Sequence, residues 1–203
     1  MKKLTFGLMG FAALSLAVAT LFTSCKKDKD DVKELASISA TIDGSSFSAT
    51  AVAKQDNNNA KLAELLAGNG DKTTSIYGAN TNGQVISIVL NGNTEATYDL
   101  SLSVEGNPTT LLINYLTTGD LEETAKNAIS ASANAMIVYK KSEGIQDANS
   151  EDFYVATKAS VVINKITNVG VIKYYKGTFT ATLENAKGTK LEVTDGKFSC
   201  PGK

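Results

Sequence analysis

Apolar and polar side chains alternate along most of the chain after residue 35, with a period of two residues. In TYDLSLSV, residues 97–104, Tyr98 and Leu100 begin a row of apolar residues on one face, and polar residues fill the other. This alternation is typical of a β-strand with one face in a core and one in water. Gly, Asn and Asp interrupt it at short intervals, as turns do. The pattern therefore predicts an all-β domain.

The first strands of this domain are predicted as a hairpin. Ile38 and Ile42 point inward, Asp43-Gly44 forms the turn, and Phe47 returns on the same face. Near the end of the chain, TKLEVTDGKFSC reads as a strand that Asp195-Gly196 interrupts as a bulge. Further strands are expected at residues 75–80, 84–91, 97–104, 110–116, 133–140, 153–157, 161–166 and 175–184.

About nine or ten strands with no repeated helix between them predict layered antiparallel packing. We expect an antiparallel β-sandwich, and the alternative is one sheet closed into a β-barrel. Two segments have helical spacing instead. NAKLAELLAGNG places Leu62, Leu65 and Leu66 on one face behind a cap at Asn59, and GDLEETAKNAIS favours a helical turn after Asp120. We expect both as short helical insertions over one end of the sandwich.

A different pattern occupies the beginning of the chain. Lys2 and Lys3 precede an uncharged run over residues 4–22, which is typical of a secretory signal. The alternative, a transmembrane anchor, is disfavoured because Gly and hydroxyl residues dilute the hydrophobicity of this run. Eight of the nine residues in 26–34 are charged, so they are predicted to form a solvated tether. Nine extended residues reach about 30 Å.

The residues before Cys25, Phe22-Thr23-Ser24, resemble the bacterial lipobox. The resemblance implies cleavage before Cys25 and attachment of a lipid to its thiol, with further acylation of the new amino terminus. One acyl chain gives only marginal membrane binding, whereas two or three hold a protein durably. The triplet Lys29-Asp30-Asp31 resembles the export signal of Bacteroidota surface lipoproteins. It implies display on the outer leaflet of the outer membrane, facing the medium.

Two longer segments also carry a resemblance. ATIDGSSFSATA and GVIKYYKGTFTATLENAKGTKLEVTDGKFS are similar to small surface-exposed Bacteroidota lipoproteins with an all-β domain of unknown function. The similarity covers most of residues 36–200, rests on strands and turns, and implies no assigned activity. The predicted organisation is a signal peptide over 1–24, the lipidated cysteine and charged flexible tether over 25–35, and a single all-β domain over 36–203.

Composition narrows the function classes. The chain has no His, Arg or Trp, and all 20 of its basic residues are lysines. Without imidazole, neither a His-based catalytic triad nor a His-ligated metal can form, and we expect no metal and no cofactor. Removing residues 1–24 takes away two lysines and no acid, which changes the net charge from −1 to −3. Nucleic acid is therefore not an expected partner, because phosphate binding needs a concentrated positive face.

Three further features are candidate sites. Tyr174 alternates with Tyr175, so if Tyr175 is in the core, Tyr174 is an exposed candidate for contact with a sugar or a partner. In DANSED, residues 147–152, the spacing of the first ligands matches a calcium loop, but Asp152 replaces the essential Gly, and a polar surface loop is favoured. Cys200 is predicted to be a small buried apolar residue, because no His or Arg can activate its thiol.

These observations predict a lipid-anchored lipoprotein of the outer membrane, acting as a non-enzymatic binding or structural module. Its partners besides the membrane would be an envelope protein or a glycan, bound through loops such as 141–152. Two alternatives remain: a barrel that carries an apolar ligand, and a glycosidase that uses paired carboxylates. The sequence does not locate such a pair, and we do not expect an enzyme.

We predict that the mature protein starts at Cys25 and carries a diacylglyceryl thioether. Intact-mass spectrometry of protein from the membrane fraction should show the loss of residues 1–24 and the added lipid mass. Cys25→Ala should abolish both changes, because the thiol is the acceptor of the lipid. An unmodified chain that still begins with Met1 would contradict the prediction.

Overall fold

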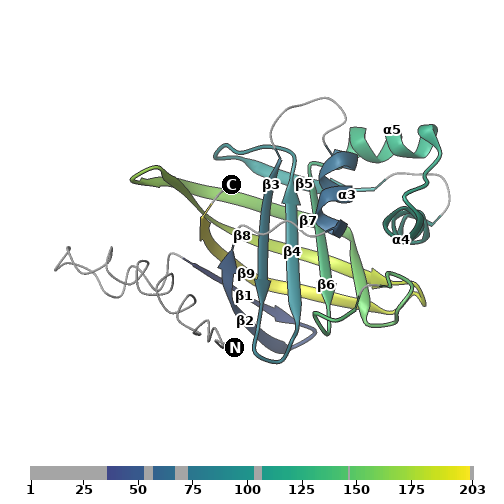
Figure 1. Ribbon diagram of the computed structural model, residues 1–203, viewed down its shortest axis with the longest axis horizontal. Helices are drawn as coiled ribbons and strands as arrows, with labels where there is room; N and C mark the ends of the chain where they lie inside the picture. Colours follow the sequence, from purple (N-terminus) through teal and green to yellow (C-terminus); the bar gives the residue numbers. More distant parts are fainter. Residues whose placement is uncertain (1–35, 53–56, 67–72, 103–106, 146, 202–203) are drawn as a thin grey trace, which may run out of the picture. The chain divides into compact units, whose positions relative to one another are not determined.

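The computed structural model describes residues 36–52, 57–66, 73–102, 107–145 and 147–201, and this part of the chain forms one antiparallel sheet and three helices (Figure 1). The strands are β1 (Ser37–Ile42), β2 (Ser45–Val52), β3 (Thr74–Ala79), β4 (Val85–Leu90), β5 (Thr97–Ser101), β6 (Ala135–Lys140), β7 (Phe153–Val169), β8 (Ile172–Asn185) and β9 (Lys190–Pro201). The helices are α3 (Asn57–Leu66), α4 (Pro108–Thr118) and α5 (Glu123–Ser132).

Eight of the nine strands close into a barrel in the order β7-β6-β4-β3-β2-β1-β9-β8, because β8 pairs back onto β7. The extra strand, β5, pairs with β7 at residues 158–162, along the edge that β6 occupies at residues 153–155. The all-β prediction is confirmed, and so is the barrel alternative, whereas the sandwich is wrong. The alternating pattern does not separate the two folds, since both bury one face of every strand.

The interior face of the barrel follows from the register. Residues directly opposite each other on paired strands share a face, as Ile76, Ile88 and Ile137 do. Ile38 and Phe47 of the predicted first hairpin also lie inside, and its turn has positive φ at both Asp43 (47°) and Gly44 (77°), as a type I′ turn requires. The prediction of this hairpin is confirmed.

Aromatic rings fill the interior where β8 and β9 bend around it. The rings of Phe179 and Phe198 lie 6.4 Å apart, and both side chains are buried. Each ring packs over a glycine of the neighbouring strand. A Cβ at Gly177 would lie 2.4 Å from Cζ of Phe198, and a Cβ at Gly196 would lie 2.7 Å from the ring of Phe179. The close approach of these rings to the sheet is therefore possible only over glycine.

The predicted bulge at Asp195-Gly196 is confirmed. The register of β9 shifts there against both β1 and β8, and Asp195 has φ of 54°. The two strands predicted at 153–157 and 161–166 are one continuous strand, β7, with register shifts against β8 near residues 157 and 164. These bulges let a long strand bend around the barrel without a break.

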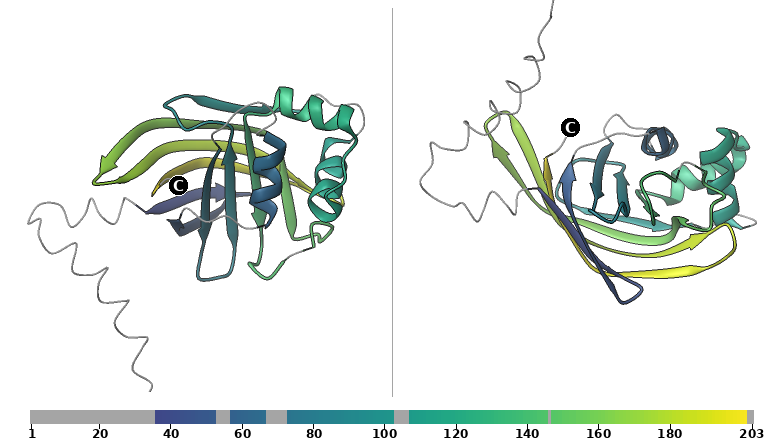
Figure 2. Two further views of the ribbon diagram at one scale, coloured as in Figure 1. Left: turned by 45° about the horizontal axis from the view of Figure 1, so that its top comes forward. Right: turned by 60° about the horizontal axis from the view of Figure 1, so that its bottom comes forward.

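The outer face of the barrel wall is buried at β4 and β6, because the three helices lie over this side of the sheet (Figure 2). Leu62, Leu65 and Leu66 of α3 form the expected apolar face. The helices are also joined to one another. Nζ of Lys61 donates to the carbonyl oxygen of Leu116 at 2.6 Å. The described chain therefore has apolar packing on both sides of one wall.

One predicted strand is wrong, and one helix is longer than expected. Residues 110–116 lie in α4 instead of a strand. Oδ1 of Asn107 caps this helix by accepting from the amides of Thr109 and Thr110, Pro108 begins it, and Gly119 ends it with φ of 85°. Its buried residues, Leu112, Ile113, Tyr115 and Leu116, have helical spacing. The turn expected after Asp120 is the helix α5, so three helices replace the one or two predicted.

The barrel has two ends, which we call the base and the mouth. β1 begins at the base with Ser37 and ends at the mouth with Ile42. The antiparallel pairing places the β1–β2, β3–β4, β6–β7 and β8–β9 connections at the mouth. The β7–β8 turn and the end of β9 lie at the base.

We predict that Gly177→Ala lowers the free energy of unfolding by about 2–3 kcal/mol, because the new methyl group would meet Phe198 and lie 2.0 Å from the carbonyl oxygen of Val162. Urea unfolding followed by circular dichroism measures this change. The control is Gly144→Ala, since the nearest atom to a Cβ there is Oγ of Ser142 at 3.8 Å. We expect the control to stay within about 0.5 kcal/mol of the wild type.

Candidate functional site

A recess of about 240 Å³ opens at the mouth of the barrel, and we call it the mouth pocket. It is lined by Ile42, Asp43, Ser45, Ser46, Phe47, Gln84, Tyr139, Lys141 and Leu191. These residues come from the β1–β2 hairpin, from the turn before β4, from the end of β6 and from β9. Segments far apart in the sequence meet here because their strands all begin or end at the mouth.

The pocket joins an apolar floor to a polar rim. Ile42, Phe47 and Leu191 are interior-facing residues at the ends of their strands, and they supply the floor. The exposed side chains of Asp43, Ser45 and Ser46 supply hydrogen-bonding groups at the rim. Such a combination suits a ligand with one apolar face and several hydroxyl or amide groups.

A chain of side-chain hydrogen bonds fixes one wall of the mouth pocket. Nδ2 of Asn80 donates to Oε1 of Gln84 at 2.8 Å, and Nε2 of Gln84 donates to the hydroxyl oxygen of Tyr139 at 2.9 Å. Because that hydroxyl accepts from Gln84, its own proton can be donated toward the pocket. Burial raises the pKa of Tyr139, outweighing the opposite effect of the Lys141 charge, so the phenol stays neutral at physiological pH.

Lys141 brings a positive charge to the pocket. Its Nζ lies 3.2 Å from Oδ1 of Asp152 and 5.5 Å from the ring centroid of Tyr154. The hydrogen bond to Asp152, followed by the one to Tyr154, raises the pKa of Lys141. The ring of Tyr154 lies 6.0 Å from that of Tyr139, which places the lysine beside two phenols. A charged donor is therefore held at the edge of the aromatic wall.

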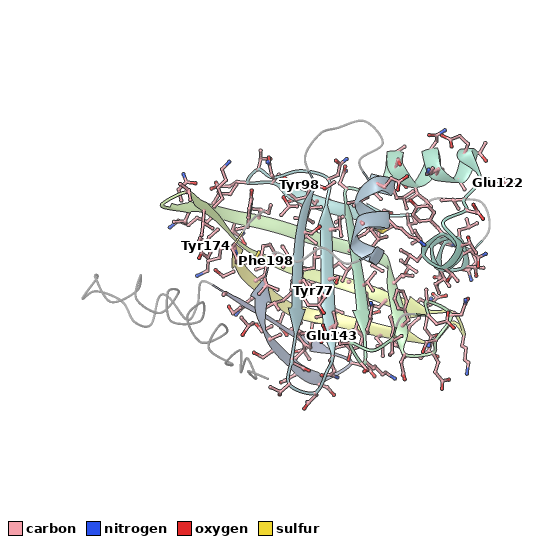
Figure 3. The ribbon with its side chains drawn as sticks, in the orientation of Figure 1. Tyr77, Tyr98, Glu122, Glu143, Tyr174 and Phe198 are labelled. Atoms are coloured by element: carbon pink, nitrogen blue, oxygen red, sulfur yellow. The ribbon has the colours of Figure 1, made fainter. Side chains whose placement is uncertain are left out.

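Two hydrogen bonds hold the loop that carries Lys141. The amide of Lys141 donates to the carbonyl oxygen of Asp152 at 3.1 Å, which joins the first and last residues of the 141–152 connection. The hydroxyl of Tyr77 donates to Oε1 of Glu143 at 2.8 Å on the outer face of β3 (Figure 3). These backbone and side-chain hydrogen bonds of the loop fix the position of Lys141.

A second recess, the outer groove, lies on the outer face of β5, β7, β8 and β9 and has a volume of about 450 Å³. Its polar residues are Asp99, Ser101, Lys158, Ser160, Thr180, Thr182, Glu192 and Thr194. Asp99 and Glu192 stand three strands apart, because β7 and β8 lie between their strands. Three strand spacings amount to about 14 Å. Paired carboxylates of glycosidases are closer, at roughly 5–9.5 Å.

Of the sequence-predicted site residues that the structure describes, none lines the mouth pocket. Cys25, Lys29, Asp30 and Asp31 lie outside the described residues. Tyr175 is buried in the interior, as expected, and Tyr174 is half-buried on the outer face of β8, opposite Pro201 at the base (Figure 3). It lies at the end of the barrel away from the mouth pocket.

The 147–152 segment is a turn whose side chains serve the loop itself. Oδ1 of Asp147 accepts from the amide of Asn149 at 2.9 Å, and Glu151 forms an ion pair with Lys187. Within the described residues, no group of three acidic or cysteine side chains comes together in a way that could hold a metal ion. The candidate calcium ligands thus have other contacts.

Sequence reasoning missed Gln84, Tyr139 and Lys141. Two signals point toward them: the ANTNGQV turn places Gln84 at a strand start, and Lys141 opens the hydrophilic connection named above as a binding segment. Tyr139 lies in an apolar strand, and only the strand register shows that it faces the interior and ends at the mouth.

Comparison of the sequence with protein-family models and with curated proteins, and of the fold with solved structures, finds no match. The similarity to Bacteroidota lipoproteins therefore stays a prediction. Among the described residues, no helix is long and apolar enough to span a bilayer.

The predicted burial of Cys200 is confirmed, since its side chain is fully buried and burial raises the pKa of its thiol to about 12. Relative to the usual value of 9.0, the thiolate fraction is lower by roughly a thousandfold. We predict that the thiol reacts with a disulfide reagent about a thousand times more slowly in the native protein than in urea.

The same shift makes stability depend on pH. Above pH 9 the unfolded thiol loses its proton while the folded thiol keeps it, so the free energy of unfolding falls up to about pH 12. Cys200→Ala should remove this part of the decline and leave the parts that come from the buried tyrosines and from Lys141 and Lys187, whose pKa values are also raised. Fast reaction of the native Cys200 thiol with the disulfide reagent would contradict its raised pKa, from which both the slow reaction and this decline are predicted.

Proposed function

We propose that this protein is a lipid-anchored lipoprotein of the outer membrane surface and that its barrel is a non-enzymatic binding module. The anchor is Cys25, and the export signal is Lys29-Asp30-Asp31. The binding site is the mouth pocket, and its ligand is a sugar unit of an envelope glycan, with a polar group of an envelope protein as the second candidate.

One observation carries the proposal: the mouth pocket and the point where the chain enters the barrel lie at opposite ends of β1. The six residues of this strand span about 20 Å. If the tether ends at the base, the mouth faces away from the membrane. An anchored binding module needs this arrangement, since a pocket at the base would be covered by lipid.

The chemistry of the pocket supports a sugar as the ligand. Sugars have apolar C–H faces and a ring of hydroxyl groups. Phe47 and the aliphatic floor suit the apolar face, while the Tyr139 hydroxyl, Lys141 and the rim serines can hydrogen-bond the hydroxyls. The volume of about 240 Å³ lies below the roughly 300–1,000 Å³ of pockets for larger ligands. A single sugar ring matches it.

The alternative functions fit the described residues less well. A carrier of an apolar ligand needs an open barrel interior, but aromatic residues such as Tyr154, Phe179 and Phe198 occupy this one. A carboxylate-based glycosidase needs two acids in one cleft at short distance, and Asp99 and Glu192 of the outer groove are separated by two intervening strands.

We predict that Ser45→Tyr abolishes ligand binding, because the new ring would fill the mouth pocket from its rim. The mature protein is tested on an array of envelope glycans and in a pull-down from envelope extract, which distinguishes the two candidate ligands. Any ligand found should bind the variant at least about tenfold more weakly.

The matched control is Ser48→Tyr. Ser48 lies on the same strand, three residues from Ser45, and faces outward opposite Ser39. The same substitution there leaves the pocket open, so binding should stay at the wild-type level. Equal loss in both variants, or none in Ser45→Tyr, would place the binding surface elsewhere.

A further inference from the structure

The hairpin of β7 and β8 extends beyond the other strands at the base of the barrel, and we call residues 165–176 the arm (Figures 1 and 2). The pairing of β5 with β7 ends at Val162, and the pairing of β9 with β8 ends at Tyr174. The turn of the arm consists of Gly170 and Val171, between the paired residues 169 and 172. Within the described part of the chain, no other strand pairs with the tip, which is a two-stranded ribbon.

The tip exposes apolar side chains. Val171 is fully exposed and Ile172 is 44% exposed, and they are two of the three large hydrophobic residues exposed in the described chain. The third, Val52, is the last residue of β2 and also lies at the base end of its strand. These three side chains lie outside the core, so the stability of the barrel does not require them to be apolar.

The arm is also positively charged. Between Asp152 and Glu184 the sequence has no acidic residue and four lysines, at positions 158, 165, 173 and 176. Lys165 and Lys176 stand directly opposite each other on the outer face of the arm. Oε1 of Glu95 accepts from the amide of Ile166 and lies beside the arm.

The order of side chains along the outer face matches the layers of a membrane interface. Ile172, Tyr174 and Lys176 alternate along β8 and share that face. From the tip toward the barrel they present an aliphatic group, a phenol and an ammonium group. Aliphatic groups prefer the hydrocarbon, tyrosine prefers the interface, and lysine extends toward phosphates and water. Tyr174 is therefore one part of an ordered series of side chains, and its position between Ile172 and Lys176 suits the interface of a membrane.

The arm lies at the same end of the barrel as the attachment of the tether. Ser37, where β1 begins, pairs with Ser199, and Ser199 pairs with Lys176. Lys176 is therefore two strands, or about 10 Å, from the point where the chain enters the barrel. The tip lies five residues farther, about 17 Å along the ribbon. Both lengths are within the roughly 30 Å that the nine tether residues can span.

We propose that the arm is a second membrane contact, in which Val171 and Ile172 enter the interface of the bilayer and Lys165 and Lys173 bind anionic lipid headgroups. The proposal rests on the proposed lipid anchor for bringing the barrel to the membrane. The arm alone offers little apolar area, but a tether holds it at high local concentration near the surface. Contact through the arm would orient the barrel with its mouth outward.

The absence of tryptophan from the chain permits a direct test. Val171→Trp introduces a unique fluorescent reporter at the tip, and Ala186→Trp introduces the same reporter in the exposed β8–β9 turn at the mouth. Each full-length lipoprotein is purified from the membrane fraction and reconstituted into vesicles of phosphatidylethanolamine and phosphatidylglycerol. We expect brominated lipids to quench the Val171→Trp emission and shift it to the blue, and to leave Ala186→Trp unchanged.

Charge is tested in the same system. In the Val171→Trp protein, the double substitution Lys165→Gln and Lys173→Gln should lower the fraction of the tryptophan emission that brominated lipids quench. We expect a decrease of about tenfold on vesicles with anionic lipid. Lys187→Gln with Lys190→Gln, at the mouth, is the matched control and should have no effect. Phosphatidylcholine vesicles should reduce quenching in the wild-type arm as well.

The outcomes separate the arm from the anchor, because intact mass reports lipidation of Cys25 independently. A lipidated protein whose Val171→Trp reporter is not quenched overturns the arm contact and leaves the anchor intact. Quenching at the tip of a chain that carries no lipid supports the arm and rejects the anchor. Equal quenching of both reporters, or a blue shift of Val171→Trp that grows with protein concentration without vesicles, would overturn the proposal in favour of nonspecific adsorption or self-association.

Discussion

The pairing of β8 with β7 is the contact on which the rest of the structure depends, because it turns one curved sheet into a closed barrel. This closure requires β8 and β9 to bend tightly, and the bend is possible because Phe198 and Phe179 rest on Gly177 and Gly196. The aromatic rings that fill the bend also fill the interior. The barrel is thereby closed around buried aromatic side chains, and the two recesses described above lie at its mouth and on its outer face.

Local features of the fold could be predicted from the sequence, but its closure could not. The β1–β2 hairpin and the Asp195 bulge follow from turn chemistry that involves only neighbouring residues. Closure depends on which distant strand pairs with β7, and alternation carries no information about that partner. The strand predicted over 110–116 is wrong, because Asn107 caps the helix α4 and Pro108 begins it.

The candidate site was predictable only in outline. The hydrophilic connection after Lys140 indicates a loop with polar groups, and Lys141 is its first residue. The residues that face Lys141 across the mouth, such as Phe47 and Leu191, come from strands remote in sequence. VISIVL and AMIVYK, the sequences of β4 and β6, are apolar at all positions except Ser87 and Lys140, which indicates burial on both faces and fits the helices that cover this wall.

Strand direction gives the two ends of the barrel different chemistry. Each antiparallel strand places one terminus at the mouth and the other at the base, so the polar rim around Tyr139 and the lysine-rich arm are separated by the length of the barrel. A core of buried side chains lies between them. The arm and the mouth pocket share no residue, so they can be altered independently.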